Sequence, residues 1–324
     1  MTPFSQPAGR PTNASTPLQF GAQLWSQGVD WTSFRDAALA AESAGWDNLW
    51  TWDHLHAIFG PWEQPIFEGW LALAAVSGIT DRIGLGLMVG ANTLRNPGLT
   101  AKLAITLDHA SGGRATLGIG GAWFEREHDA FGIDFGSSIG ERLDRLDESV
   151  MLIRRLLDGE RFSHEGRFYT FHDALSAPPP VQAHLPILVG GSGPRKTLRT
   201  VAKYADVWNT SGSFDDVRQH VANLERHCAD VGRDASQIVR SISFPIVLRD
   251  SRADAESAFA VLAAHNGTLA AGNVPHLLGP PADVADTIRP YVTELGFRHV
   301  GVRMPAPYDR ETIARVSELR DLLA

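Results

Sequence analysis

The 324-residue sequence has a single cysteine, Cys228, which excludes an intramolecular disulfide and a cysteine-based metal cluster. It also lacks long basic runs. Its 37 acidic and 29 basic side chains give a formal net charge of −8, which argues against a nucleic-acid or anionic-membrane surface. No apolar stretch approaches the roughly 18 residues of a membrane helix, and residues 1–17 lack the apolar core of a signal peptide. We therefore expect a cytoplasmic protein of small-molecule chemistry with a disordered tail over residues 1–17.

From residue 18 onward, short apolar runs alternate with longer segments of helical periodicity. The first run, 18–24, precedes a segment in which Phe34, Ala37 and Ala41 recur at helical spacing. Seven further strand-like runs follow, at 47–52, 83–89, 115–119, 186–189, 205–208, 238–248 and 298–302. This order is typical of βα units around a parallel sheet, and eight strands favour an α/β fold with a single (β/α)₈ TIM barrel over residues 18–324.

An open doubly wound sheet is the alternative fold. The turn after the first run, residues 24–30, lacks the glycine-rich fingerprint of dinucleotide-binding sheets, which favours the closed barrel. One segment interrupts the barrel pattern. Residues 161–171 predict a hairpin that turns at Glu165-Gly166, and three consecutive prolines follow at 178–180. We interpret residues 160–182 as an insertion.

Active sites of such barrels lie on the loops after the strands, so we look for candidate site residues there. The first candidates follow the second strand-like run. Asp53 and His54 stand there, in a region that holds five of the nine tryptophans and so offers stacking surface. A histidine can transfer protons near neutral pH, although it can equally serve only as a backbone hydrogen-bond partner. The spacing of His54 and His56 also suggests a metal-dependent hydrolase, but the other strand ends supply no matching ligands, so we predict no metal site.

The loop Gly190-Gly191-Ser192-Gly193 stands between a predicted strand and a predicted helix. Exposed backbone amides and the positive end of a helix can hold a phosphate there. The alternative interpretation is a tight turn that needs glycine only for its dihedral angles. The serine and the two basic residues that follow favour a phosphate site.

Two further loops carry polar or aromatic side chains. Asn92 and Thr93 follow the third run and can hydrogen-bond a heterocycle. After the fourth run, a glycine-rich stretch leaves Trp123 at the barrel mouth. Glu125 and Glu127 come next, at the start of a predicted helix, and we interpret them as partners of the helix dipole rather than as catalytic groups.

Together these segments resemble the bacterial luciferase-like superfamily, and within it the coenzyme F420-dependent oxidoreductases. The resemblance is strongest from Phe20 to Trp208. It is carried by Trp52-Asp53-His54, the run from Leu85 to Pro97, Ser111-Gly112-Gly113-Arg114, the run from Gly118 to Trp123, Gly140-Glu141-Arg142 and the run from Ile187 to Gly191.

The resemblance implies a flavin or deazaflavin whose ring lies at the barrel mouth and whose phosphate lies at the glycine loop. It places His54 beside the reactive edge of the ring as the catalytic residue. It also implies a non-proline cis peptide, here between Met88 and Val89, that supports the ring. The residues expected to contact the cofactor are Asp53, Met88, Val89, Asn92, Thr93, Gly190, Gly191, Ser192 and Gly193.

The implied reaction is hydride transfer between F420 and a small organic substrate. Sugar-phosphate dehydrogenases of this group use a glutamate after the fourth strand as proton donor, whereas this chain has Trp123 at the matching place, so their substrate is not carried over. Two alternatives remain: a monooxygenase that uses FMN, O₂ and a flavin reductase partner, and a non-catalytic flavin-binding protein. Relatives commonly pair, so we expect a homodimer through the helices after the second and third strands.

Overall fold

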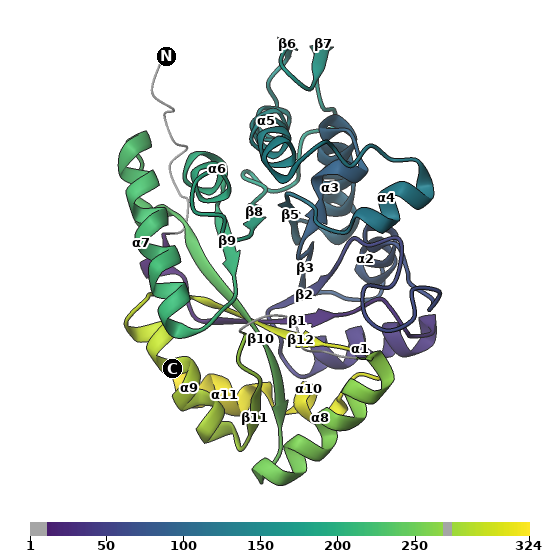
Figure 1. The fold of residues 1–324 in the computed structure, drawn as a ribbon, viewed down its shortest axis with the longest axis vertical. Helices are drawn as coiled ribbons and strands as arrows, with labels where there is room; N and C mark the ends of the chain where they lie inside the picture. The colour runs from purple at the N-terminus through teal and green to yellow at the C-terminus, as the bar shows by residue number, and fades with distance from the viewer. Residues whose placement is uncertain (1–11, 268–273) are drawn as a thin grey trace.

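Eight parallel strands close into a barrel in the computed structural model, which describes residues 12–267 and 274–324 (Figure 1). In their order around the ring, the strands are β1 (Gln19–Leu24), β2 (Asn48–Thr51), β3 (Gly84–Leu87), β5 (Ala115–Gly120), β8 (Ile187–Gly190), β9 (Val207–Thr210), β10 (Val239–Leu248) and β12 (His299–Met304). The pairings of β12 with both β10 and β1 close the ring. The predicted (β/α)₈ barrel is confirmed.

The helices surround the barrel and pack their apolar sides against the strands (Figure 1). In α1, for example, Phe34, Ala37 and Ala41 are fully buried, as their spacing predicts. The helices that follow the strands are α1 (Trp31–Ser43), α2 (Gly69–Ser77), α3 (Pro97–Ser111), α5 (Ile139–Leu157), α6 (Thr197–Tyr204), α7 (Phe214–Val231), α8 (Arg252–Asn266), α9 (Pro281–Thr293), α10 (Arg310–Ala314) and α11 (Val316–Leu323).

Two short strands were not predicted, and a short helix begins at Glu125, where the sequence predicts one. The third strand-like run is broken at a cis peptide between Met88 and Val89, the bond that the resemblance implied, and continues as β4 (Gly90–Ala91) beside β5. Helix α4 (Glu125–Phe131) stands between β5 and α5. Strand β11 (Leu277–Gly279) pairs with β10 on the outside of the ring. All three lie at or near the carboxyl end of the barrel strands.

The insertion contains an antiparallel hairpin of β6 (Phe162–Glu165) and β7 (Thr170–Ala174). Its turn spans residues 166–169, just after the predicted position at Glu165-Gly166, because Glu165 still pairs with Thr170. Of the predicted N-terminal tail, residues 1–11 lie outside the described residues. The next residues form a 3₁₀ helix, Asn13–Ser15, and the Asn13 side chain donates a hydrogen bond to the Gly296 carbonyl at 2.7 Å.

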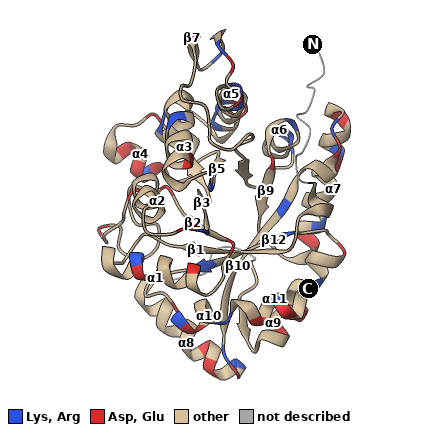
Figure 2. Cartoon of the chain, turned by 180° about the vertical axis from the view of Figure 1, so that it is seen from behind, with Lys and Arg blue, Asp and Glu red and all other residues tan. Residues whose placement is uncertain are grey.

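Most charged side chains lie on the helices around the barrel (Figure 2). Within the described ranges, no helix is both long enough and apolar enough to cross a membrane.

A polar layer fills the barrel interior. The indole of Trp50 donates a hydrogen bond to His299 Nε2 at 3.2 Å, so this nitrogen carries no proton and Nδ1 donates to Ser241 Oγ at 2.6 Å. Asn209 Nδ2 donates to the hydroxyls of Ser241 and Ser243, at 2.9 and 3.0 Å. Burial lowers the pKa of His299 to about 4. The histidine is therefore neutral at physiological pH.

Candidate active site

A cavity of about 430 Å³ opens at the carboxyl end of the barrel. Every barrel strand, or the loop that follows it, contributes to the lining: Gln23, Trp52, Met88, Gly120, Gly190, Asn209, Ser243 and Arg303 in ring order. The volume lies within the range of roughly 300 to 1,000 Å³ of small-molecule and cofactor sites. This is the end of the barrel where such folds place their active sites.

His54 and Glu127 form a hydrogen-bonded pair in the wall of this cavity. His54 Nδ1 lies 3.0 Å from Glu127 Oε1, and the carboxylate, only 1% exposed, also accepts a 2.7 Å hydrogen bond from the Leu55 amide. Because an ionised carboxylate can only accept, Nδ1 carries the proton. His54 Nε2 has no hydrogen-bond partner in the described part of the chain and remains available to a ligand.

Aromatic rings hold His54 in place. The edges and faces of Trp52, Trp123 and Phe124 contact the imidazole, with ring centroids 5.6 to 5.8 Å away. Trp123 is 61% exposed, so its indole covers His54 from the solvent side. This packing limits rotation of the imidazole.

Helix α4 is fixed through the residue after Glu127. His128 Nδ1 donates to the Phe124 carbonyl at 2.9 Å, so Nε2 accepts a hydrogen bond from Thr93 Oγ1 at 2.6 Å. His128 is fully buried. Thr93 thus binds α4 and does not line the cavity.

Asp53 is also bound elsewhere. Its carboxylate accepts two hydrogen bonds from Arg95, at 2.6 and 3.0 Å, and one from the Ala91 amide at 3.2 Å. Burial raises the pKa of Asp53, and the charge of Arg95 opposes this. The bidentate ion pair connects the loop after β2 to the start of α3. Asp53 therefore supports the loop that carries His54 and does not line the cavity.

Glycines shape the wall opposite β12. A Cβ atom on Gly190 would lie 2.8 Å from Val89 Cγ1, and one on Gly120 would lie 2.9 Å from Val89 Cγ2. Only glycine fits at these two positions without a shift of Val89. In the loop after β8, the Gly191 amide donates to the Asn209 carbonyl at 3.0 Å, which leaves the next residues, Ser192 and Gly193, between the cavity and α6.

Half of the ten predicted site residues line the cavity: His54, Met88, Val89, Gly190 and Gly191. The other five, Asp53, Asn92, Thr93, Ser192 and Gly193, are not in its wall. Asn92 is buried, and its Nδ2 atom has no hydrogen-bond partner among the described residues.

Glu127, Gln23 and Arg303 are among the lining residues that the sequence analysis did not place at the site. Glu125 and Glu127 lie in the first turn of α4, as predicted, but the buried carboxylate of Glu127 also binds His54, whereas Glu125 is exposed. Gln23 and Arg303 also line the cavity, and each is the penultimate residue of its strand. Polar side chains at the ends of apolar strand-like runs were the available signal for these two.

A second cavity, of about 770 Å³, lies outside the barrel beside α1. Its ionisable side chains already have partners. Asp30 caps α1 through the Ser33 amide, His265 binds the Gly28 carbonyl, and Arg310 binds the Asp36 carbonyl. The smaller cavity in the barrel mouth therefore holds the chemically available groups.

Comparison with known proteins identifies the family. Residues 12–287 match the family described as luciferase-like monooxygenase. The chain belongs to this family.

An uncharacterized protein of Mycobacterium tuberculosis is 35% identical over 167 residues, 52% of this chain and 58% of that protein. The phthiodiolone/phenolphthiodiolone dimycocerosates ketoreductase of Mycobacterium tuberculosis is 31% identical over 247 residues, 69% of this chain and 63% of that protein. The chain thus spans about three fifths of these relatives' lengths.

Solved structures share the fold and differ in cofactor. An F420-dependent secondary alcohol dehydrogenase, solved with an F420-acetone adduct, superposes with a TM-score of 0.81 at 18% identity, over 95% of this chain and 99% of that chain. A type II Baeyer-Villiger monooxygenase of Pseudomonas putida in complex with FMN gives a TM-score of 0.73 at 18% identity, over 95% and 99% of the two chains. One of these two structures holds an F420 adduct and the other holds FMN.

Proposed function

We propose that this luciferase-like protein is an oxidoreductase that transfers hydride between coenzyme F420 and a small organic substrate. The observation that carries the proposal is the His54–Glu127 pair in the wall of the cavity, in which His54 Nε2 has no partner among the described residues. Two comparisons support the choice of F420 chemistry. One relative is named a ketoreductase, and the alcohol dehydrogenase with the TM-score of 0.81 is F420-dependent.

The lining suits a flat ring in size and composition. Met88 and Val89 would support the ring, because the glycines beside Val89 keep that wall free of side chains. Gly190 and Gly191 would lie beside the phosphate, with Ser192 and Gly193 completing the loop before α6. The bound cofactor supplies the hydride chemistry, and the protein supplies orientation and proton transfer.

His54 moves the proton in this proposal. Glu127 fixes the tautomer with the proton on Nδ1, so that Nε2 accepts the hydroxyl proton of an alcohol during oxidation. In the reverse direction, the protonated ring donates from Nε2 to the carbonyl oxygen of the substrate. Trp123 and Phe124 hold the imidazole in this orientation and restrict the access of water.

A cofactor titration tests the proposal directly. Purified protein is titrated with F420 and with FMN while the fluorescence of the tryptophans in the cavity wall, Trp25, Trp52 and Trp123, is followed. We expect F420 to bind at least about tenfold more tightly than FMN, a difference of about 1.4 kcal/mol. Tighter binding of FMN would favour the monooxygenase, and tight binding without turnover would favour the non-catalytic flavin-binding protein.

A homodimer is the second part of the proposal. Leu71 on α2 and Leu99 on α3 are 73% and 51% exposed, on the two helices that the sequence suggests for pairing. Burial of such side chains in a twofold interface would be favourable. Sedimentation velocity of the wild type and of a Leu71→Glu, Leu99→Glu variant tests this. We expect the variant to sediment as a monomer.

A further inference from the structure

Arg303 stands at the carboxyl end of β12 and has no hydrogen-bond or ion-pair partner among the described residues. It lies opposite Gln23 of β1 and Pro245 of β10 in the strand register. Its side chain lines both the active-site cavity and a narrow apolar crevice of about 30 Å³ behind Trp25 and Phe59. Over residues 12–267 and 274–324, no carboxylate, carbonyl or hydroxyl group forms a hydrogen bond or ion pair with the guanidinium.

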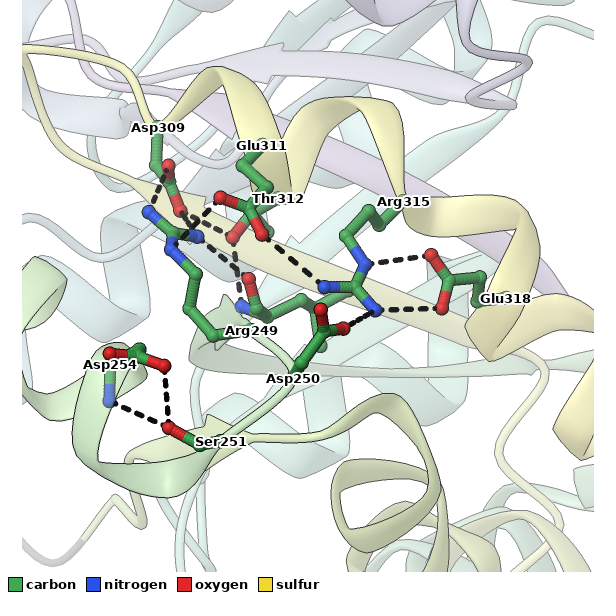
Figure 3. A network of polar contacts seen from close by, with 10 residues as sticks. Arg249, Asp250, Ser251, Asp254, Asp309, Glu311, Thr312, Arg315 and Glu318 are labelled. Atoms are coloured by element: carbon green, nitrogen blue, oxygen red, sulfur yellow. Dashed lines mark hydrogen bonds and ion pairs between the residues drawn. The ribbon is translucent and has the colours of Figure 1, made fainter.

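The two carboxylates in the walls of these cavities are already bound. Glu127 binds His54 and the Leu55 amide. Asp309, in the crevice, binds both terminal nitrogens of Arg249 at 2.9 Å and accepts a hydrogen bond from Thr312, as Figure 3 shows. Arg249 and Arg303 thus differ sharply in their surroundings. The first has a bidentate counter-ion, and the second has none.

Within the part of the chain that the structure describes, no unpaired negative charge compensates Arg303. Burial lowers the pKa of Arg303 to about 10, so the side chain still carries its charge at neutral pH. The pKa of the neighbouring His276 is lowered mainly by burial and also by the charge of Arg303. His276 is therefore uncharged at pH 7. A partly buried cation without a partner is costly, and a ligand that brings an anionic oxygen would offset this cost.

We infer that Arg303 is the recognition residue for an anionic oxygen of the ligand in this cavity, and that the substrate supplies this oxygen as a carboxylate. The inference rests on the proposed function only in taking this cavity as the reaction site. β12 and β5 lie opposite each other in the ring, with three strands between them on either side. Arg303 is thus far from the glycine-shaped wall at Gly120, where we place the cofactor. The substrate class is a small carbonyl compound or alcohol that carries a carboxylate.

A pair of isosteric probes tests the charge requirement. Butyrate and the neutral butyramide are titrated into the wild type and Arg303→Gln at constant ionic strength, with tryptophan fluorescence as readout. We expect butyrate to bind at least about tenfold more weakly to the variant, as for the loss of a hydrogen bond to a charged group, and butyramide to bind both proteins alike. Arg298→Gln is the matched control, because Arg298 precedes β12 at the opposite end of the barrel. It should retain wild-type affinity.

A second titration distinguishes the substrate from the cofactor as the source of the anionic oxygen. Oxidised and reduced F420 and FMN are titrated into the same proteins. If Arg303→Gln weakens only the reduced forms and leaves butyrate unchanged, the anionic oxygen belongs to the reduced ring and the substrate assignment is overturned. If neither butyrate nor a reduced cofactor responds, the recognition role itself is overturned. Failure of both cofactors to bind the wild type would reject the proposed function and leave the butyrate comparison intact.

Thermal unfolding of the ligand-free protein gives a readout that needs no activity. Arg303→Met replaces the unpaired cation by an apolar chain of similar length, so we expect the melting temperature to rise by a few degrees, about what 1 kcal/mol gives in a protein of this size. Arg298→Met should leave it unchanged. A lower melting temperature for Arg303→Met would mean that the guanidinium has a stabilising partner in the protein, which would overturn the inference.

Discussion

Two histidines at different depths of the barrel have opposite chemical surroundings. At the barrel mouth, His54 donates from Nδ1 to the carboxylate of Glu127 and keeps Nε2 free. Inside the barrel, His299 uses both nitrogens: Trp50 donates to Nε2, and Nδ1 donates to Ser241. The mouth therefore holds a histidine that can exchange a proton with a ligand, and the interior holds one that is locked as the neutral tautomer.

The difference shows that the same residue type has two roles in neighbouring layers of the barrel. The indole N–H of Trp50 can only donate, so a proton on His299 Nε2 would face another donor. The same interior network continues through Asn209 and Ser243, which also line the cavity. A fully bonded layer thus forms the floor of the site. His54 lies in the wall above this layer, and its Nε2 can accept or donate a proton.

The largest expected effect is on turnover when His54 is replaced. His54→Gln keeps an amide donor for Glu127 and removes the imidazole nitrogen that accepts and donates the proton. We expect single-turnover hydride transfer to fall by about 10² to 10⁴-fold, as for the loss of a general acid–base residue. Cofactor absorbance reports the rate, with 3-hydroxybutyrate as a test substrate that carries both an alcohol and a carboxylate.

His56→Gln is the control for this variant, because His56 lies in the same loop and its ring packs against Trp62 and Phe131 outside the cavity. It should leave turnover unchanged. An undiminished rate in His54→Gln would show that His54 is not a catalytic residue. The two histidines would then differ in their hydrogen bonds but not in catalytic function.

The second effect concerns the pH dependence of stability. The pKa of His299 is about 4 in the folded protein and about 6.5 when unfolded, so the unfolded chain binds more protons between these pH values. The stability from the neutral ring is therefore complete above pH 6.5 and is lost as the pH falls towards 4. We expect this one group to lower the free energy of unfolding by about 2 to 3 kcal/mol between pH 7 and 4.5.

Urea titrations of His299→Gln at pH 7 and pH 4.5 measure this contribution, because the variant cannot take up the proton. Its loss of stability between the two pH values should be smaller than that of the wild type by that amount. His172→Gln, at an exposed position on β7, should follow the wild type. Identical pH dependence in His299→Gln and the wild type would show that His299 is not held neutral.

The third effect concerns the carboxylate partner of His54. Glu127→Gln keeps the size of the side chain and an acceptor oxygen, but it removes the charge and adds an amide donor that can hold the wrong tautomer. We expect turnover to fall by about 10 to 100-fold, as for other residues that orient a reactive imidazole. The pH profile of the rate should shift, which mere loosening of α4 would not cause. Glu125→Gln, at the exposed neighbouring position, serves as control.

The smallest effect is expected at the other end of the interior network. Ser241→Ala removes the acceptor for His299 Nδ1 and for one Asn209 hydrogen bond. The free energy of unfolding should fall by about 1 to 3 kcal/mol, because a buried donor is left unsatisfied, while cofactor binding stays the same. Chemical denaturation and the cofactor titration measure the two quantities. A variant with full stability would mean that another group accepts the His299 proton.

The barrel was predictable because each βα unit buries an apolar run against a helix with an apolar stripe. Both patterns are local in the sequence, and they agree with the structure from β1 to α11. The cis bond between Met88 and Val89 came from the resemblance, since no local pattern encodes it. Strand β11 was missed because three residues are too few to show a period.

Side-chain partners distant in the sequence were not predictable. Glu127 stands 73 residues from His54, and acidic residues in a first helical turn are ordinary. Asp53 was expected at the cofactor, but Arg95, 42 residues later in a segment that reads as a turn, binds its carboxylate. Thr93 was expected at the ring and instead binds His128. In each case the fold, rather than the local sequence, selects the partner.

Helix α4 has seven residues, and its two buried side chains reach two different loops. Glu127 binds the loop after β2, and His128 binds Thr93 after β4. Because α4 itself follows β5, it connects the carboxyl ends of β2, β4 and β5. The number of residues between β5 and α4 therefore sets the position of both contacts at once. An insertion before Phe124 would displace both side chains. An insertion directly after Gly132 would disturb His128, because the Ile133 amide donates to the His128 carbonyl and the Phe135 ring packs against the imidazole. Loop redesign that aims at new substrates should accordingly leave residues 124–135 unchanged.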